Sequence, residues 1–164
     1  MKKKTRPALA SLVFLLIIAV LLVIDQSSKV WAREALAGLT SPLVGIPKIL
    51  NFTYVENTGA AFGILEGAYW YFIVMATLVS LASLWFILGG HYHSKLQVFS
   101  LSLIVAGALG NIIDRIAYGF VTDFLSFAFM NFPVFNVADI CITIGAALFV
   151  IAVLFLDSNE EKAA

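Results

Sequence analysis

The sequence predicts an all-α integral membrane protein with four transmembrane helices and a small extracytoplasmic β-element inserted between helices one and two. Hydrophobic residues make up 62% of the 164 residues and charged residues only 12%, whereas a soluble domain carries about a quarter charged residues. The mean hydropathy is +1.00. Four apolar stretches run approximately over 8–24, 68–90, 96–113 and 137–156, and strand-forming residues gather at 41–66.

The four apolar stretches have the length of membrane-spanning helices, because about 17–25 residues cross a hydrocarbon core of roughly 30 Å. The first stretch follows four basic residues, as the core of a signal peptide does. No small-residue cleavage site comes after it; DQSSK at 25–29 follows instead. We therefore expect an uncleaved first span in a single membrane domain, 1–164.

The basic residues predict the orientation, since Lys and Arg near the ends of spans favour the cytoplasmic side. One side carries Lys2, Lys3, Lys4, Arg6, Lys95 and Lys162. The other side carries Lys29, Arg33, Lys48 and Arg115. The cluster at the N-terminus predicts that both termini face the cytoplasm, which places 25–67 and 114–136 outside.

Segment 41–66 reads differently from the four apolar stretches. Its prolines and glycines, together with strand-forming residues such as Phe52, Thr53 and Val55, predict short strands and turns. It is apolar for a water-exposed loop, so we expect it to lie against the membrane surface.

The charge and cysteine content exclude several classes of protein. The formal net charge is zero, so the chain offers no basic face to a nucleic acid. The single cysteine, Cys141, cannot form a disulfide framework. His91 and His93 alone do not complete a metal site. We expect no metal, no cofactor and no obligate protein partner.

Four acidic residues are the first candidates for a functional site. Asp25, Asp114, Asp123 and Asp139 all lie at or beside the predicted outer ends of the apolar stretches. Ionisable groups at membrane depth cost a few kcal/mol each to insert, so they mark functional sites. The predicted topology brings these distant residues to one membrane face.

Helical spacing groups further residues with Asp114. Gly107, Gly110, Asn111 and Asp114 recur at i, i+3, i+4 and i+7, which places them on one helix face. Glycines on such a face let another backbone come close. The stripe is either part of a polar site or a packing seam that ends in a solvated Asp114 neutralised by Arg115.

Two further arrangements have both a structural and a functional interpretation. Asn136 can cap the fourth helix with Asp139 at its third position, where the helix dipole favours a negative charge. The dipole would also help to keep Asp139 ionised, so capping is compatible with a catalytic role. Asp25 and Lys29 are four residues apart and can form an ion pair, or one of them can contact a lipid head group or substrate.

Asp123 lies among aromatic residues, in the sequence FVTDFLSF at 120–127. A desolvated carboxyl there has a raised pKa, and a carboxyl that stays protonated near neutral pH can act as a general acid. The alternative is an interfacial turn with the carboxylate in water.

The motifs together resemble the lipoprotein signal peptidases (signal peptidase II). The matching blocks, in the order of that family, are DQSSK at 25–29, ENTGAAFG at 56–63, AGALGNIIDR at 106–115, VTDF at 121–124 and FNVAD at 135–139. Five blocks in order across the whole chain are specific, although each alone is not. Ala106 departs from the pattern, because many members have Gly there.

The resemblance implies an aspartic endopeptidase that cleaves diacylglyceryl-modified bacterial prolipoproteins just before the lipidated cysteine. Asp123 and Asp139 are then the catalytic pair, and Asp114 is a supporting residue paired with Arg115. Further site-shaping or substrate-binding positions are Asp25, Lys29, Asn57, Gly59, Gly110, Asn111, Asp114, Arg115 and Asn136. The implied setting is the bacterial cytoplasmic (inner) membrane, with membrane lipid around the protein and the site at its outer face.

Three other functions remain open at this point. Ser27 or Ser28 with Lys29 could form a Ser–Lys hydrolase pair, although neighbours on a helix do not face one another. Intramembrane acids also occur in small transporters and proton channels, which would need polar groups at depth. A lipid or lipoprotein binder without activity would have the same pocket.

Overall fold

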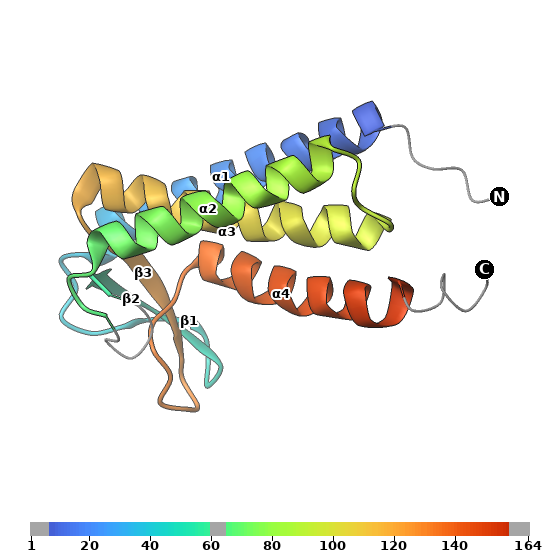
Figure 1. The fold of residues 1–164 in the computed structure, drawn as a ribbon. Helices are drawn as coiled ribbons and strands as arrows, with labels where there is room; N and C mark the ends of the chain where they lie inside the picture. Colours follow the sequence, from blue (N-terminus) through green and yellow to red (C-terminus); the bar gives the residue numbers. More distant parts are fainter. Residues whose placement is uncertain (1–6, 60–64, 158–164) are drawn as a thin grey trace.

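The computed structural model describes residues 7–59 and 65–157. Its elements, in chain order, are α1 (Pro7–Leu36), β1 (Leu43–Ile46), β2 (Leu50–Asn57), α2 (Tyr69–Leu88), α3 (Lys95–Tyr118), β3 (Val121–Phe127), α4 (Val137–Ile151) and a π-helical extension, η2 (Ala152–Asp157). The helices lie alongside one another, and the three strands lie at one end of them (Figure 1). The beginning of α1 and the end of α4 lie at the opposite end (Figure 1).

The prediction of four helices long and apolar enough to cross a membrane is confirmed within the described residues. Helix α3 is the central one: it packs against α1, α2 and α4, and most of its side chains are buried. The other three helices expose large apolar side chains outward, such as Leu16, Trp70 and Ile144. An apolar outer surface of this kind suits a lipid environment.

Helix α1 extends beyond the predicted end of the first apolar stretch at residue 24 and continues to Leu36. The sequence contains no Gly or Pro between 25 and 36, and the next helix-breaking residue is Gly38. The added turns bury Asp25 and Lys29 completely or nearly so, at 2% and 0% exposure. The predicted span therefore stops where the apolar residues stop. The helix itself continues, because its polar face packs inside the protein.

The small sheet has three strands in the order β1-β2-β3, and both pairs are antiparallel. Two strands come from the predicted β-element at 41–66, of which residues 60–64 lie outside the described part. The third strand, β3, comes from the connection between α3 and α4, where no strand was predicted. Pairing of Val55 with Asp123 brings the two segments together.

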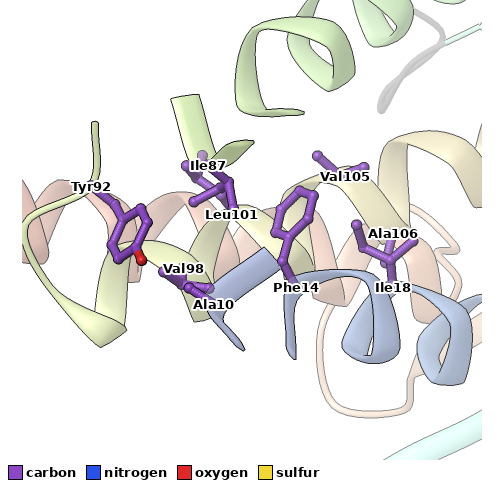
Figure 2. Packing of buried hydrophobic residues seen from close by; sticks show 9 residues of the cluster. All are labelled: Ala10, Phe14, Ile18, Ile87, Tyr92, Val98, Leu101, Val105 and Ala106. Carbon is purple, nitrogen blue, oxygen red and sulfur yellow. The ribbon is translucent and has the colours of Figure 1, made fainter. Parts of the chain in front are cut away.

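The core of the bundle is apolar at the end away from the sheet. Figure 2 shows its buried side chains: Ala10, Phe14 and Ile18 of α1, Ile87 of α2, Tyr92, and Val98, Leu101, Val105 and Ala106 of α3. A second cluster at the sheet end joins Ala32 and Leu36 of α1 to Phe124 and Leu125 of β3. The second cluster fixes β3, and therefore Asp123, against α1.

Glycines on α3 allow α1 and α4 to come close to it. A Cβ atom at Gly107 would collide with the backbone oxygen of Ala138 on α4. A Cβ atom at Gly110 would lie 2.5 Å from Oδ2 of Asp25 on α1. The predicted glycine stripe is thus a packing seam, and it also holds polar groups of α1 and α4 next to Asn111.

Candidate active site

Asp139 lies in the first turn of α4, and Asn136 caps this helix as predicted. The side-chain oxygen of Asn136 accepts a hydrogen bond of 2.9 Å from the backbone N–H of Asp139. In return, Oδ2 of Asp139 accepts a hydrogen bond of 3.2 Å from the backbone N–H of Asn136. This reciprocal capping box satisfies two backbone donors of the helix N-terminus and fixes the Asp139 carboxyl in place.

Asp123 comes to the same place from β3. The side-chain N–H of Asn136 donates a hydrogen bond of 2.6 Å to Oδ1 of Asp123. Asn136 therefore contacts both carboxyl groups, one through its side chain and one through its backbone. Asp123 and Asn136 are 1% and 0% exposed and Asp139 is half-buried, so the two carboxyls that the resemblance pairs lie in one largely buried cluster.

Two more asparagines hold the carboxyls. Asn57, at the end of β2, donates a hydrogen bond of 2.8 Å to Oδ2 of Asp123 and accepts one of 2.9 Å from the backbone N–H of Gly59. Asn111 of α3 donates a hydrogen bond of 2.9 Å to Oδ1 of Asp139. Each amide oxygen is occupied by a donor, so each amide N–H points at a carboxyl.

The surroundings of Asp123 change its acidity. Burial is the main cause that raises the pKa of the Asp123 carboxyl to about 7, and the neighbouring Asp139 carboxylate contributes to the same rise. The hydrogen bonds from Asn57 and Asn136 act in the opposite direction, because they favour the ionised form. The net result is a carboxyl that still holds a proton in a large share of molecules near neutral pH, as a general acid needs.

A buried charged cluster lies directly behind the carboxyl pair. The ammonium group of Lys29 lies 3.0 Å from Asp25 Oδ2, which confirms the predicted ion pair. Lys29 also donates a hydrogen bond of 2.9 Å to Oδ1 of Asn111. The other oxygen of Asp25 accepts a hydrogen bond of 2.9 Å from the backbone N–H of Ala138 on α4. Asp25 thus binds the helix turn that carries Asp139 directly. Lys29 acts through Asn111, which donates a hydrogen bond to the Asp139 carboxyl.

The expected pairing of Asp114 with Arg115 is wrong. Asp114 is fully buried and lies 3.5 Å from the ammonium group of Lys29 and 3.7 Å from the guanidinium of Arg33. Arg115 instead donates a hydrogen bond of 3.0 Å to the backbone oxygen of Gly59. Consecutive helical residues point about 100° apart, so Asp114 faces α1 while Arg115 faces the segment after β2.

The Ser–Lys alternative has no geometric support. The ammonium group of Lys29 is surrounded by Asp25, Gly110 and Asn111. The hydroxyl of Ser28 donates to the backbone oxygen of Asp25 at 2.7 Å, and Ser27 is exposed. Neither hydroxyl is therefore paired with the lysine.

A cavity of about 690 Å³ opens beside the two carboxyls. Asp123 and Asp139 line its polar part together with Asn57, Asn111 and Arg115. Its remaining wall is apolar and includes Phe72, Met75 and Val79 of α2, Ile104 and Ala108 of α3, and Ile144 of α4. The guanidinium of Arg115 lies 4.4 Å from the centroid of the Phe72 ring, between the polar and the apolar parts. The cavity can hold an apolar molecule with a polar bond next to the carboxyls.

Sequence reasoning missed three residues of the cluster, namely Gln26, Arg33 and Thr122. Gln26 donates to Asp25, to the backbone oxygen of Gly110 and to Asp114. Arg33 continues the helix face of Asp25 and Lys29 at the spacing i, i+4, i+8. That spacing was a usable signal, but it requires a helix that continues beyond residue 24.

These features define a multi-pass membrane protein with a pair of carboxyls, one buried and one half-buried, at one end of its helices beside a largely apolar cavity. A family model described as signal peptidase (SPase) II matches residues 17–155. The chain therefore belongs to the signal peptidase II family, which makes it a protease.

Relatives agree with this assignment over nearly the whole chain. A lipoprotein signal peptidase of Clostridioides difficile is 38% identical over 154 residues, which cover 92% of this chain and 100% of that protein. One from Symbiobacterium thermophilum is 42% identical over 138 residues, covering 83% and 89%. A bacterial membrane enzyme solved by the in meso method at 2.3 Å resolution superposes with a TM-score of 0.82 at 34% identity, covering 90% of each chain.

Proposed function

We propose that this chain is an aspartic endopeptidase that removes signal peptides from diacylglyceryl-modified bacterial prolipoproteins, by cleavage just before the lipidated cysteine. Asp123 and Asp139 are its catalytic pair. The single observation that carries the proposal is the placement of both carboxyls around Asn136, at the polar end of the apolar cavity.

The two carboxyls divide the chemistry between them. Two acids in one site do not both ionise readily, so they share a proton. Asp139, at a helix N-terminus that favours negative charge, is the base that takes a proton from the attacking water. Asp123 holds the shared proton, consistent with its pKa of about 7, and polarises the scissile carbonyl.

The bond changes balance without a covalent intermediate. The water oxygen adds to the carbonyl carbon while Asp139 takes one water proton and Asp123 gives its proton to the carbonyl oxygen. The tetrahedral diol then collapses, the C–N bond breaks, and the leaving nitrogen takes a proton from Asp139. Asp123 recovers a proton from the diol, which restores the starting state.

The cavity suits a lipidated precursor. Its apolar wall from α2, α3 and α4 accepts apolar chain, while the polar part faces the bond to be cut. Apolar burial has no direction, so it cannot set which bond is cleaved. The asparagines and Arg115 at the polar part are the groups that can hold the peptide backbone in register.

The proposed orientation puts the carboxyl pair and the sheet at the outer face of the bacterial cytoplasmic membrane. The beginning of α1 and the end of α4 lie at the opposite end of the helices from the sheet (Figure 1). The basic residues that precede α1 in the sequence, Lys2, Lys3, Lys4 and Arg6, favour the cytoplasmic side. Membrane lipid is then the neighbour of the exposed apolar faces.

The test is a gel-shift assay of a lipidated precursor with purified enzyme in detergent. Asp123→Asn and Asp139→Asn are expected to give no product while the protein stays folded. Asp114→Asn, which changes a carboxyl outside the cavity, is expected to keep measurable activity. Full activity of Asp123→Asn would refute the proposal. The transporter or proton-channel alternative is not favoured, because the relatives are peptidases over nearly the whole chain.

A further inference from the structure

Arg33, in the last turn of α1, joins three elements behind the carboxyl pair. Its Nη1 donates a hydrogen bond of 2.8 Å to the hydroxyl of Thr122 on β3. The same atom lies 3.7 Å from Oδ1 of Asp114 on α3. Its guanidinium carbon lies 4.3 Å from the centroid of the Tyr118 ring. These contacts restrict the guanidinium on several sides.

Thr122 is held at two points by this arrangement. Its backbone N–H donates a hydrogen bond of 2.9 Å to Oδ2 of Asp114, and its hydroxyl accepts from Arg33. Thr122 and Asp114 are both fully buried. The beginning of β3 is therefore hydrogen-bonded to α1 through Arg33 and to α3 through Asp114.

The next residue in β3 is Asp123, and successive side chains of a strand point to opposite faces. Thr122 faces α1 and α3, so Asp123 faces the other way, toward Asn57 and Asn136. Fixing one face of the strand thus fixes the direction in which the carboxyl is presented on the other face. A displacement of about 1 Å at a reacting group can lower a rate by about a hundredfold.

We propose that Arg33 is a positioning residue that sets the place of the Asp123 carboxyl by acting through Thr122. The inference rests on the proposed function, in which Asp123 is catalytic. The described residues that line the cavity do not include Arg33, so Arg33 affects the chemical step and not substrate binding. Its loss lowers kcat and leaves KM unchanged.

The experiment compares Arg33→Gln, Thr122→Val and the double variant in a cleavage assay of a lipidated precursor, with kcat expressed per folded enzyme. A charge-assisted hydrogen bond contributes enough to lower kcat by about tenfold when it is removed. We expect this loss in Arg33→Gln, a similar loss in Thr122→Val, and no further loss in the double variant. Arg33→Lys, which keeps a donor for Thr122, is expected to recover part of kcat. Glu34→Gln, which removes a charge from the exposed neighbour, is expected to leave kcat unchanged.

Three results overturn the proposal: wild-type kcat in Arg33→Gln, additive losses in the double variant, or an equal loss in Glu34→Gln. Asp123→Asn, measured alongside, separates the inference from the function it rests on. An inactive Asp123→Asn with a fully active Arg33→Gln would refute only the role of Arg33. A fully active Asp123→Asn would refute the catalytic pair itself.

Discussion

Asn136 donates its side-chain N–H to Oδ1 of Asp123 across 2.6 Å, while the oxygen of the same amide caps α4. One side chain thus combines two tasks, because it fixes a helix end and orients a carboxyl. The two tasks can be separated by substitution. A serine can cap a helix but is too short to reach Asp123.

Asn136→Ser is therefore expected to lower kcat by about tenfold or more, through the lost charge-assisted hydrogen bond, while the free energy of unfolding changes little. Asn136→Ala loses the cap as well, and its free energy of unfolding is expected to fall by about a further 1 kcal/mol. Precursor cleavage and thermal unfolding in detergent measure the two effects. Equal stability of the two variants would contradict the capping role.

The protonated state of Asp123 predicts that activity falls as the pH rises. Burial and the Asp139 carboxylate raise the pKa of Asp123 to about 7, and the proposed mechanism needs its proton on the carbonyl oxygen. We expect kcat to decrease above about pH 7, approaching about tenfold per pH unit. Initial rates from about pH 5 to about pH 9 test this. A kcat that stays constant to the alkaline end would exclude Asp123 as the acid.

The same raised pKa has a consequence for stability. The unfolded chain releases the Asp123 proton near its ordinary pKa of 3.8, whereas the folded chain retains it to about 7. Between pH 3.8 and about 7, the folded state binds more protons than the unfolded state, so the free energy of unfolding falls as the pH rises. Asp123→Asn removes this contribution. The melting temperature of wild type should thus decline relative to that of Asp123→Asn across this range, with Glu34→Gln as the control.

Loss of Lys29 is expected to destabilise the protein strongly. Lys29 is fully buried between Asp25 and Asp114, and removal of one partner of a buried ion pair costs about 3–5 kcal/mol. Lys29→Met should therefore yield little folded protein, and Lys48→Met, at an exposed position, should not. In the double variant Asp25→Asn/Lys29→Met, the amide oxygen at position 25 can still accept the hydrogen bond from the backbone N–H of Ala138. The substitution also removes the negative charge of Asp25, which Lys29→Met alone leaves without its partner. The double variant should accumulate better than Lys29→Met in detergent extracts.

The seam between α3 and α4 predicts sensitivity to a single methyl group. An alanine at Gly107 would place its Cβ against the backbone oxygen of Ala138, and overpacking of this kind costs about 1–3 kcal/mol. Gly38→Ala has open space around its Cβ and serves as the control. Thermal unfolding should show a lower melting temperature for Gly107→Ala alone. An unchanged melting temperature would mean that α3 and α4 can move apart enough to accommodate the methyl group without loss of stability.

The helices and the polar residues could be predicted because they depend on local patterns. Apolar runs of membrane length located the four helices, and the spacing of Asn136 and Asp139 located the cap at the start of α4. The third strand was missed because Asp123 interrupts a run of strand-forming residues, and its partner β2 is far away in sequence. Strand pairing over that distance leaves no periodic signal in either segment.

The partners of Asp114 could not be predicted for a related reason. Adjacency in sequence favoured Arg115, but a helix turns adjacent side chains to different neighbours. The true partners, Lys29 and Arg33, lie on α1, in turns that hydropathy excluded from the helix. Once a polar segment is buried inside the protein, the boundary of apolar composition no longer marks the boundary of the helix.

The hydrogen bond from the backbone N–H of Ala138 to the Asp25 carboxyl joins residues that are 113 positions apart. Residues near the beginning of the chain therefore complete the first turn of the last helix, on which Asp139 is carried. A growing chain has no finished site until α4 has been synthesised and has packed against α1 and α3. The protein therefore cannot hydrolyse a precursor before the segment that forms α4 has been synthesised.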